Sequence, residues 1–128
     1  MHGDAALRWA IVMVGLVAAN LSSSAIAADP AAGKAVFTST CSICHSVQPG
    51  KNMVGPSLAG VVGRKTGSVP GFHYSPDNQN ANLTWDEATL DKYLQSPRTT
   101  IPGTTMTYAG LKDDTKRADL IAYLATLK

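Results

Sequence analysis

Hydrophobic residues recur at helical spacing in three parts of the chain. The first predicted helix has Asp29 as its N-cap and Pro30 at its first position, and it runs to about Thr40. One face of this helix carries the mostly small or apolar residues Ala32, Gly33, Val36, Phe37 and Thr40. This face is expected to lie against the rest of the protein.

A second helix is predicted after Leu83. Thr84 and Glu87 are spaced as a capping box, with Thr84 at the N-cap and Glu87 at N3. Pro97 lies just past the predicted end of the helix. Its inward-facing positions are Leu90, Tyr93 and Leu94.

The third predicted helix spans about residues 114–127. Its polar residues Lys116, Arg117 and Asp119 are expected to face water. Its broad apolar face consists of Leu120, Ile121, Tyr123, Leu124 and Leu127. Nothing in the chain has the pattern of a β-rich or βαβ protein, so the predicted fold class is all-α.

The segment between the first two helices has no helical or alternating pattern. Residues 46–83 are 38 residues that include ten glycines and prolines. So long a loop is unusual in a compact domain, and three helices offer few large apolar side chains to offset the cost of ordering it. The composition therefore predicts that something besides protein fills the core.

The charge of the chain makes nucleic acid an improbable partner. Charged residues make up 16% of the sequence, the net charge is +2, and the lysines and arginines are scattered singly. The length of 128 residues fits one modest domain.

The N-terminal segment has the features of an export signal. An arginine and a histidine precede the uninterrupted apolar run 9–19, whose 11 residues are fewer than the roughly 20 that a membrane-spanning helix needs. Ala25-Ile26-Ala27 follows as a cleavage site. We predict a cleaved signal peptide at residues 1–27 and a mature domain at residues 28–128, with an uncleaved membrane anchor as the alternative.

The two cysteines of the chain point to a cofactor. Cys41-Ser42-Ile43-Cys44-His45 is a C-x-x-C-H motif, in which two thiols can bond the vinyl groups of one haem while the histidine binds its iron. Alternatives are a zinc site, a redox dithiol and a local disulfide. Zinc would need further ligands, of which the mature chain offers only His73, and no buried strand precedes the motif as in a dithiol oxidoreductase.

Whether the protein supplies a sixth ligand to the iron distinguishes an electron carrier from a protein that binds or activates small ligands. Met106 lies 61 residues after His45, in a segment stiffened by proline and glycine, and is the favoured candidate because a thioether raises the potential and closes the site. Met53 follows His45 by eight residues and is expected to be a packing residue. His73 lies in a loop and is expected at the surface.

Several separated blocks of sequence share a common pattern with a known family. They are Cys41-Ser42-Ile43-Cys44-His45, Gly55-Pro56-Ser57-Leu58, Gly63-Arg64-Lys65-Thr66-Gly67, Pro70-Gly71-Phe72-His73-Tyr74, Leu83-Thr84-Trp85, Tyr93-Leu94, Ile101-Pro102-Gly103-Thr104-Thr105-Met106 and Asp119-Leu120-Ile121-Ala122-Tyr123-Leu124. Residues 32–127, which contain them, resemble class I cytochrome c, and most closely mitochondrial cytochrome c and bacterial cytochrome c2. The resemblance implies three main helices and long loops wrapped around one covalently attached haem.

The resemblance also implies where the helices meet and what single residues do. Gly33 and Phe37 of the first helix would cross Leu120 and Tyr123 of the last. The implied haem-binding residues besides the motif and Met106 are Pro56, which accepts a hydrogen bond from His45, then Arg64, Tyr74 and Trp85 at a haem propionate, and Asn78, Tyr93 and Thr104 near the methionine sulfur.

The function implied is that of a periplasmic electron carrier, which transforms no substrate. Its partners would be a quinol:cytochrome c reductase-type donor and an oxidase, reaction centre or dehydrogenase-type partner, and the carrier would be a monomer. The alternatives are a haem peroxidase or gas binder with a labile sixth ligand, and the same carrier tethered to the membrane. Where the mitochondrial-type family rings its haem edge with lysines, this chain keeps Arg98 and Lys112 but has uncharged residues at Thr40, Met53, Thr99 and Thr105.

Overall fold

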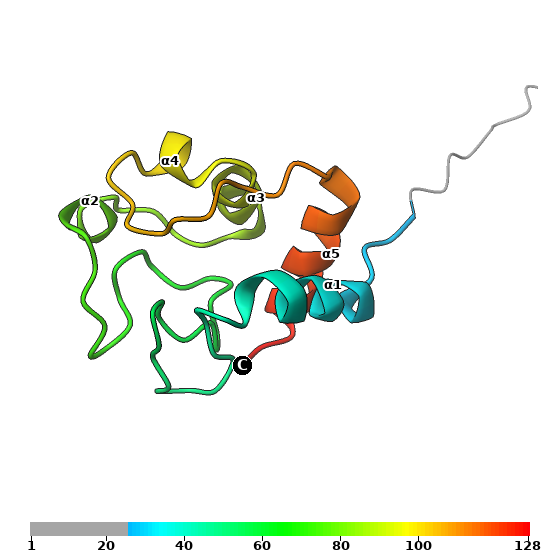
Figure 1. Ribbon diagram of the computed structural model, residues 1–128, viewed down its shortest axis with the longest axis horizontal. Coiled ribbons are helices and arrows are strands. Elements are labelled where there is room, and N and C mark those ends of the chain that lie inside the picture. The colour runs from blue at the N-terminus through cyan, green and yellow to red at the C-terminus, as the bar shows by residue number, and fades with distance from the viewer. Residues whose placement is uncertain (1–25) are drawn as a thin grey trace, which may run out of the picture.

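The computed structural model describes residues 26–128, which form a helical protein with long loops (Figure 1). The helices are α1 (Pro30–Val36), the π-helical turn η1 (Phe37–Cys41), α2 (Pro76–Gln79), α3 (Glu87–Gln95), α4 (Pro97–Thr100) and α5 (Asp114–Ala125). Within this part of the chain, β-pairing amounts to one isolated bridge between Lys65 and Thr84. The all-α prediction is confirmed.

The predicted signal peptide lies outside the described residues, apart from its last two positions. Across residues 26–128, no helix combines the length and the hydrophobicity that crossing a membrane requires.

Helix α1 begins as its sequence predicts and ends in a wider turn. The Asp29 side chain accepts a hydrogen bond of 2.9 Å from the Ala31 amide, and Pro30 starts the helix. From Phe37 the helix continues as η1, closed by the 3.0 Å bond from the Ser42 amide to the Phe37 carbonyl. Single π-turns of this kind are frequent at functional sites. This one ends at Cys41, the first residue of the C-x-x-C-H motif.

Helices α1 and α5 cross in close contact, as the resemblance implies (Figure 1). Gly33 is buried at the crossing, where a Cβ atom would overlap the Asp119 backbone and lie 2.9 Å from Cβ of Tyr123. The rings of Phe37 and Tyr123 lie 5.6 Å apart between centroids. The absence of a side chain at Gly33 therefore allows the two backbones to touch.

The capping box predicted for the second helix is wrong. The N-cap of α3 is Asp86, whose side chain accepts a 2.7 Å bond from the Thr89 amide. Thr84 lies before the helix, in the bridge to Lys65, and the Trp85 amide donates to the Arg64 carbonyl at 2.8 Å. Pairing with this loop holds the backbone extended, so the helix starts later. The inward positions Leu90, Tyr93 and Leu94 are buried as predicted.

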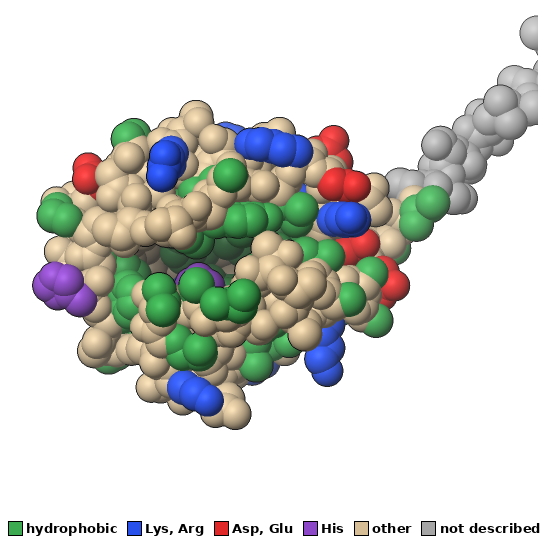
Figure 2. Space-filling model, in the orientation of Figure 1, with side chains coloured by type: hydrophobic (Ala, Val, Ile, Leu, Met, Phe, Trp, Pro, Cys, Tyr) green, Lys and Arg blue, Asp and Glu red, His purple; other side chains and the backbone are tan. Residues whose placement is uncertain are grey.

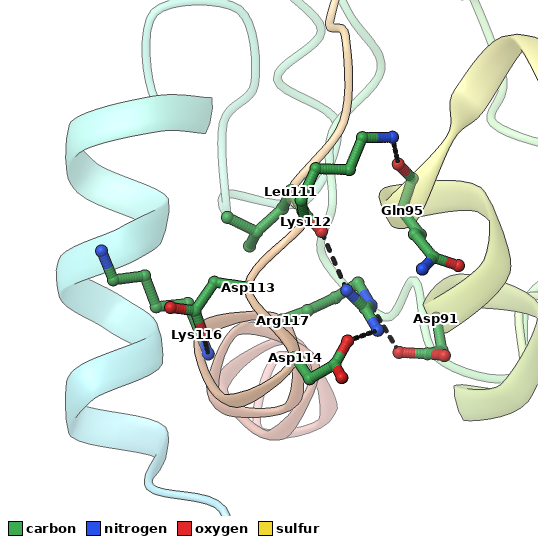
Figure 3. A network of polar contacts seen from close by, with 8 residues as sticks. All are labelled: Asp91, Gln95, Leu111, Lys112, Asp113, Asp114, Lys116 and Arg117. Carbon is green, nitrogen blue, oxygen red and sulfur yellow. Dashed lines mark hydrogen bonds and ion pairs between the residues drawn. The ribbon is translucent and has the colours of Figure 1, made fainter.

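The expectation that Arg117 faces water is also wrong. Its side chain is 5% exposed, because two carboxylates, Asp91 of α3 and Asp114 of α5, pair with the guanidinium at 2.6 and 2.7 Å (Figure 3). Asp119 is half-buried, and its carboxylate accepts a 2.8 Å bond from the Asp29 amide. Lys116 alone of the three residues is exposed as expected.

Two short helices interrupt segments that lack hydrophobic periodicity. Both α2 and α4 begin with a serine followed by a proline, at Ser75-Pro76 and Ser96-Pro97. The Ser75 hydroxyl caps α2 by accepting a bond of 3.2 Å from the Asn78 amide. The hydrophobic core is built from the longer helices and from the segments that connect them. Its buried members are Phe37, Val61, Trp85, Leu90, Tyr93, Leu94, Ile101, Leu120, Ile121 and Leu124.

Candidate functional site

A cavity of about 450 Å³ opens on the face shown in Figure 2. Its volume falls within the range of about 300–1,000 Å³ typical of sites for organic ligands. All eleven residues singled out from the sequence line it: Cys41, Cys44, His45, Pro56, Arg64, Tyr74, Asn78, Trp85, Tyr93, Thr104 and Met106. These positions span 66 residues of sequence, and the fold brings them to one place.

His45 is fixed on one wall of the cavity by its neighbours. Its Nδ1 donates a hydrogen bond of 2.8 Å to the Pro56 carbonyl, which leaves Nε2 as the unprotonated nitrogen. Gly55 passes so close that a Cβ there would lie 2.6 and 2.7 Å from the ring nitrogens. Burial lowers the pKa of His45 more than the Pro56 bond raises it, and nearby Arg64 lowers it further. The ring is therefore neutral at pH 7, the form that binds metals.

The two cysteines lie on the turn that leads into His45. The amides of Cys44 and His45 both donate to the Cys41 carbonyl, at 3.1 and 2.9 Å. Both thiols are free and half-buried, so the local disulfide alternative is not formed. Burial raises the pKa of Cys41 to about 11, and Cys44 adds to the shift. In residues 26–128, no three His, Cys, Asp or Glu side chains gather as a possible metal site.

A second group of polar residues lies around a half-buried positive charge. Arg64 donates through Nη1 to the carbonyls of Ser57 and Ala59, at 2.9 and 3.1 Å, while its buried Nε has no hydrogen-bond partner. Tyr74 accepts a 3.1 Å bond from the Val69 amide, so its hydroxyl proton remains available to donate. Trp85 contributes an indole N–H, which only donates. This group is suited to bind an anion.

A third group lies beside Met106. The hydroxyls of Tyr93 and Thr104 share a hydrogen bond of 2.9 Å, and Thr104 also accepts from the Met106 amide at 3.3 Å. Burial raises the pKa of Tyr93, with the Thr104 bond opposing it, so the phenol is neutral at pH 7. Oδ1 of Asn78 is buried without a hydrogen-bond partner.

The three candidates for a sixth ligand lie in different places. Met106 is half-buried and lines the cavity. His73 is exposed, as expected, and lies outside the cavity lining. Met53, expected to be a packing residue, is 42% exposed and lies outside the lining as well, because it belongs to a surface turn.

Comparisons with known proteins identify the family of this chain. Residues 30–128 match the model of the family Cytochrome c. This chain belongs to the cytochrome c family. It is 52% identical to cytochrome c2 of Rhodomicrobium vannielii, over 91% of this chain and 93% of that protein. It is 54% identical to cytochrome c2 iso-2 of Magnetospirillum molischianum, over 79% of this chain and all of that protein. Cytochrome cH from Methylobacterium extorquens has the same fold, with a TM-score of 0.72 and 43% identity over 77% of this chain and 98% of that one.

Membership in the cytochrome c family identifies the cofactor and the activity. The chain binds one covalent haem c through Cys41 and Cys44, and it is an electron carrier rather than an enzyme. The cavity fits this group. The unpartnered Nε–H of Arg64 is a donor that requires an acceptor, and a haem propionate carries such oxygens. The rest of the lining is largely apolar, as a porphyrin requires.

Sequence reasoning missed most of the apolar wall and the contact of Gly55 with His45. The wall residues are Leu58, Val61, Phe72, Leu90, Leu94, Leu120 and Leu124. Their helical periodicity marks Leu90, Leu94, Leu120 and Leu124 as buried but leaves open what they face. The loop residues have no periodicity that could have identified them.

The mouth of the cavity is apolar and uncharged. Ile43 and Val54 line the cavity, yet they are 77% and 78% exposed. Thr40, Thr105 and Thr107 also line it. Figure 2 shows hydrophobic and uncharged side chains around the opening, with the lysines, arginines and acidic residues farther out.

Proposed function

We propose that this cytochrome is a periplasmic one-electron carrier with His45 and Met106 as the axial ligands of its iron. The observation that carries the proposal is the placement of the candidates: His45 and Met106 line one cavity, whereas Met53 and His73 do not. The haem, once attached, supplies a reversible change between ferrous and ferric iron. The protein's residues set the conditions for that change.

His45 binds through Nε2, because Pro56 holds the Nδ1 proton. Such an outer hydrogen bond fixes the tautomer and ring orientation and raises the basicity of the ligand. Gly55 and Pro56 together prevent the ring from turning away. His45 is thus prepared as a ligand by the chain itself.

Arg64, Tyr74 and Trp85 bind a haem propionate. A buried carboxylate is costly unless it is paired and hydrogen-bonded, and these residues offer a charge and two further donors. The unpartnered Nε of Arg64 supports this role. Pairing with Arg64 would keep this carboxylate ionised.

Tyr93 and Thr104 hold the segment that carries Met106, and Asn78 lines the same cavity. The bond between Tyr93 and Thr104 ties this segment to α3, and the bond from the Met106 amide to Thr104 orients its backbone. Keeping the thioether in place is what separates a carrier from an enzyme or gas binder, which needs an open iron position.

The ligand assignment is tested by visible absorption of the ferric protein. A sulfur ligand gives a weak band at the red end of the spectrum, which Met106→Ala should abolish. Met53→Ala is the matched control and should retain the band, because Met53 lies outside the cavity lining. Loss of the band in Met53→Ala, or its survival in Met106→Ala, would overturn the assignment.

We further propose that residues 1–27 direct export and are removed. The short apolar run and the Ala25-Ile26-Ala27 site support this. The intact mass of protein from the periplasmic fraction should correspond to a chain beginning at Ala28 plus one haem. A full-length chain found only in washed membranes would support a tethered carrier instead.

The partners are redox proteins that dock, one at a time, at the cavity mouth. A quinol:cytochrome c reductase-type donor and an oxidase, reaction centre or dehydrogenase-type acceptor fit a monomeric carrier. The exposed Ile43 and Val54 support docking through apolar contact, since no charged side chain apart from the half-buried Arg64 lines the cavity. The interface is expected to be small, below about 1,200 Å², as for other transient redox complexes.

A further inference from the structure

The segment that carries Met106 is attached to α3 on both sides. Upstream, Thr104 bonds Tyr93 at 2.9 Å. Downstream, the Leu111 amide donates to the Leu94 carbonyl at 2.7 Å, and the Lys112 ammonium donates to the Gln95 carbonyl. The last turn of α3 therefore forms a fixed support for the end of the segment.

The downstream attachment is tightened by a glycine. Gly110 has a φ of 118°, which other residues rarely adopt, and a Cβ there would overlap the Gln95 carbonyl. The backbones of Gly110 and Gln95 are therefore in direct contact, with no room for a side chain at Gly110.

Arg117 reaches this attachment from a third element. Figure 3 shows its guanidinium between α5, α3 and the chain at Leu111. Nη1 donates to the Leu111 carbonyl at 2.9 Å, Nε to Asp91 at 2.6 Å and Nη2 to Asp114 at 2.7 Å. Both backbone groups of Leu111 are consequently held: its carbonyl accepts from Arg117, and its amide donates to the Leu94 carbonyl.

We propose that Arg117 is a positioning residue for Met106. Moving the Met106 segment away from the haem requires the attachment at Leu111 to loosen. Arg117 opposes this, because a buried guanidinium that loses one acceptor has no solvent to replace it. Its effect on Met106 passes through Leu111, five residues along the chain. This inference rests on the proposed ligation of the iron by Met106.

The two carboxylates that bind Arg117 have different consequences. Asp91 belongs to α3, 26 residues away, and its side chain is 48% exposed. Asp91 therefore fixes the guanidinium of Arg117 relative to α3, to which the Met106 segment is attached. Asp114 lies three residues from Arg117 on the same helix, and its side chain is 86% exposed. Asp114 orients the guanidinium only within α5, so the proposal assigns it little influence on Met106.

The proposal is tested with the haem-containing protein and imidazole, which binds the ferric iron only when the methionine segment opens. We expect Arg117→Gln to bind imidazole at least about tenfold faster than the native protein, since it removes a charged donor from a buried carbonyl. Asp91→Asn should give a smaller acceleration, and Arg117→Lys should restore part of the native rate. Asp114→Asn is the matched control, with an expected change of less than about twofold.

A second readout separates positioning from general destabilisation. Hydrogen exchange at the Leu111 amide should accelerate in Arg117→Gln by a factor similar to that for imidazole. Ile121→Val removes a methylene from the buried face of α5 and should lower the unfolding midpoint while leaving both rates near native.

Two results would overturn the proposal. One is an imidazole rate in Arg117→Gln no faster than in Asp114→Asn. The other is an equal acceleration in Ile121→Val, which would reduce Arg117 to a contributor to overall stability. Failure of the ligand assignment is recognised separately, because Met106→Ala would then retain the red-end band.

Discussion

Gly33→Ala should destabilise the protein although it improves the local helix. An alanine inside a helix is favoured over glycine by about 1 kcal/mol. At Gly33, however, the new Cβ would lie 2.5 Å from the Asp119 carbonyl carbon and 2.9 Å from Cβ of Tyr123. Carbon atoms pack at about 3.5–4.0 Å, so α1 and α5 would have to separate by roughly 1 Å.

The separation would loosen the packing of Phe37 and Tyr123 at the crossing. Overpacking of this kind costs about 1–3 kcal/mol or more, and here the obstacle is backbone, which does not rotate away. We expect a net loss of about 2 kcal/mol after the helix gain is counted. For a domain near 100 residues this lowers Tm by about 10 °C.

Thermal unfolding followed by far-UV circular dichroism measures the effect on the haem-containing protein. Ala35→Gly, on the exposed side of α1, is the matched control. It reverses the propensity change without touching the crossing, so it should cost about 1 kcal/mol or less. A Gly33→Ala protein as stable as the native one, or more stable, would refute the reasoning.

Two further predictions concern the surface and the pH response. Electron transfer with the native partner should slow only mildly as salt rises toward ~0.15 M, where the Debye length is about 8 Å, and Thr105→Lys should steepen this dependence if the partner is acidic. Stopped-flow kinetics check it, and a steep loss of rate in the unmodified protein would mean that the docking surface lies elsewhere. Burial raises the pKa of Tyr93 above its ordinary 10.0, so above about pH 10 the unfolded chain releases a proton that the folded chain keeps, and stability falls as pH rises. Tyr93→Phe should flatten this fall in denaturant titrations at alkaline pH, and an unchanged slope would contradict the role of Tyr93.

The parts of the fold that follow from local sequence could be predicted. The start of α1 follows from the neighbouring residues Asp29 and Pro30, and the buried faces of α3 and α5 follow from periodicity. The motif around Cys41 and His45 identified the cofactor because its spacing places two thiols and a histidine where one haem can bond all three. The Ser-Pro pairs that open α2 and α4 were a comparable signal that the sequence reasoning passed over.

The errors have non-local causes. Thr84 and Asp86 both have the character of an N-cap, and the pairing of Thr84 with Lys65 decides between them. Arg117 appears as an ordinary surface residue because its partner Asp91 lies 26 positions away. Such contacts depend on how the helices pack, which no short stretch of sequence encodes.

The site was predictable to a different degree. The motif and the ligand argument singled out Cys41, Cys44, His45 and Met106. The family resemblance added seven residues whose separate chemistry gives no reason to group them, and the fold brings all eleven to one cavity. The apolar mouth at Ile43 and Val54 could be recognised only in the structure, because the sequence does not show whether an aliphatic side chain in a loop is exposed.

Carbon monoxide binding by the ferrous protein tests the central claim most directly. A carrier with His45 and Met106 on its iron has no open position, so its visible spectrum at neutral pH should stay unchanged under carbon monoxide. Met106→Ala should instead give the spectrum of a carbon monoxide complex, which proves that the assay detects an open iron. Rapid formation of that complex by the native protein would contradict the account and favour a gas binder or peroxidase.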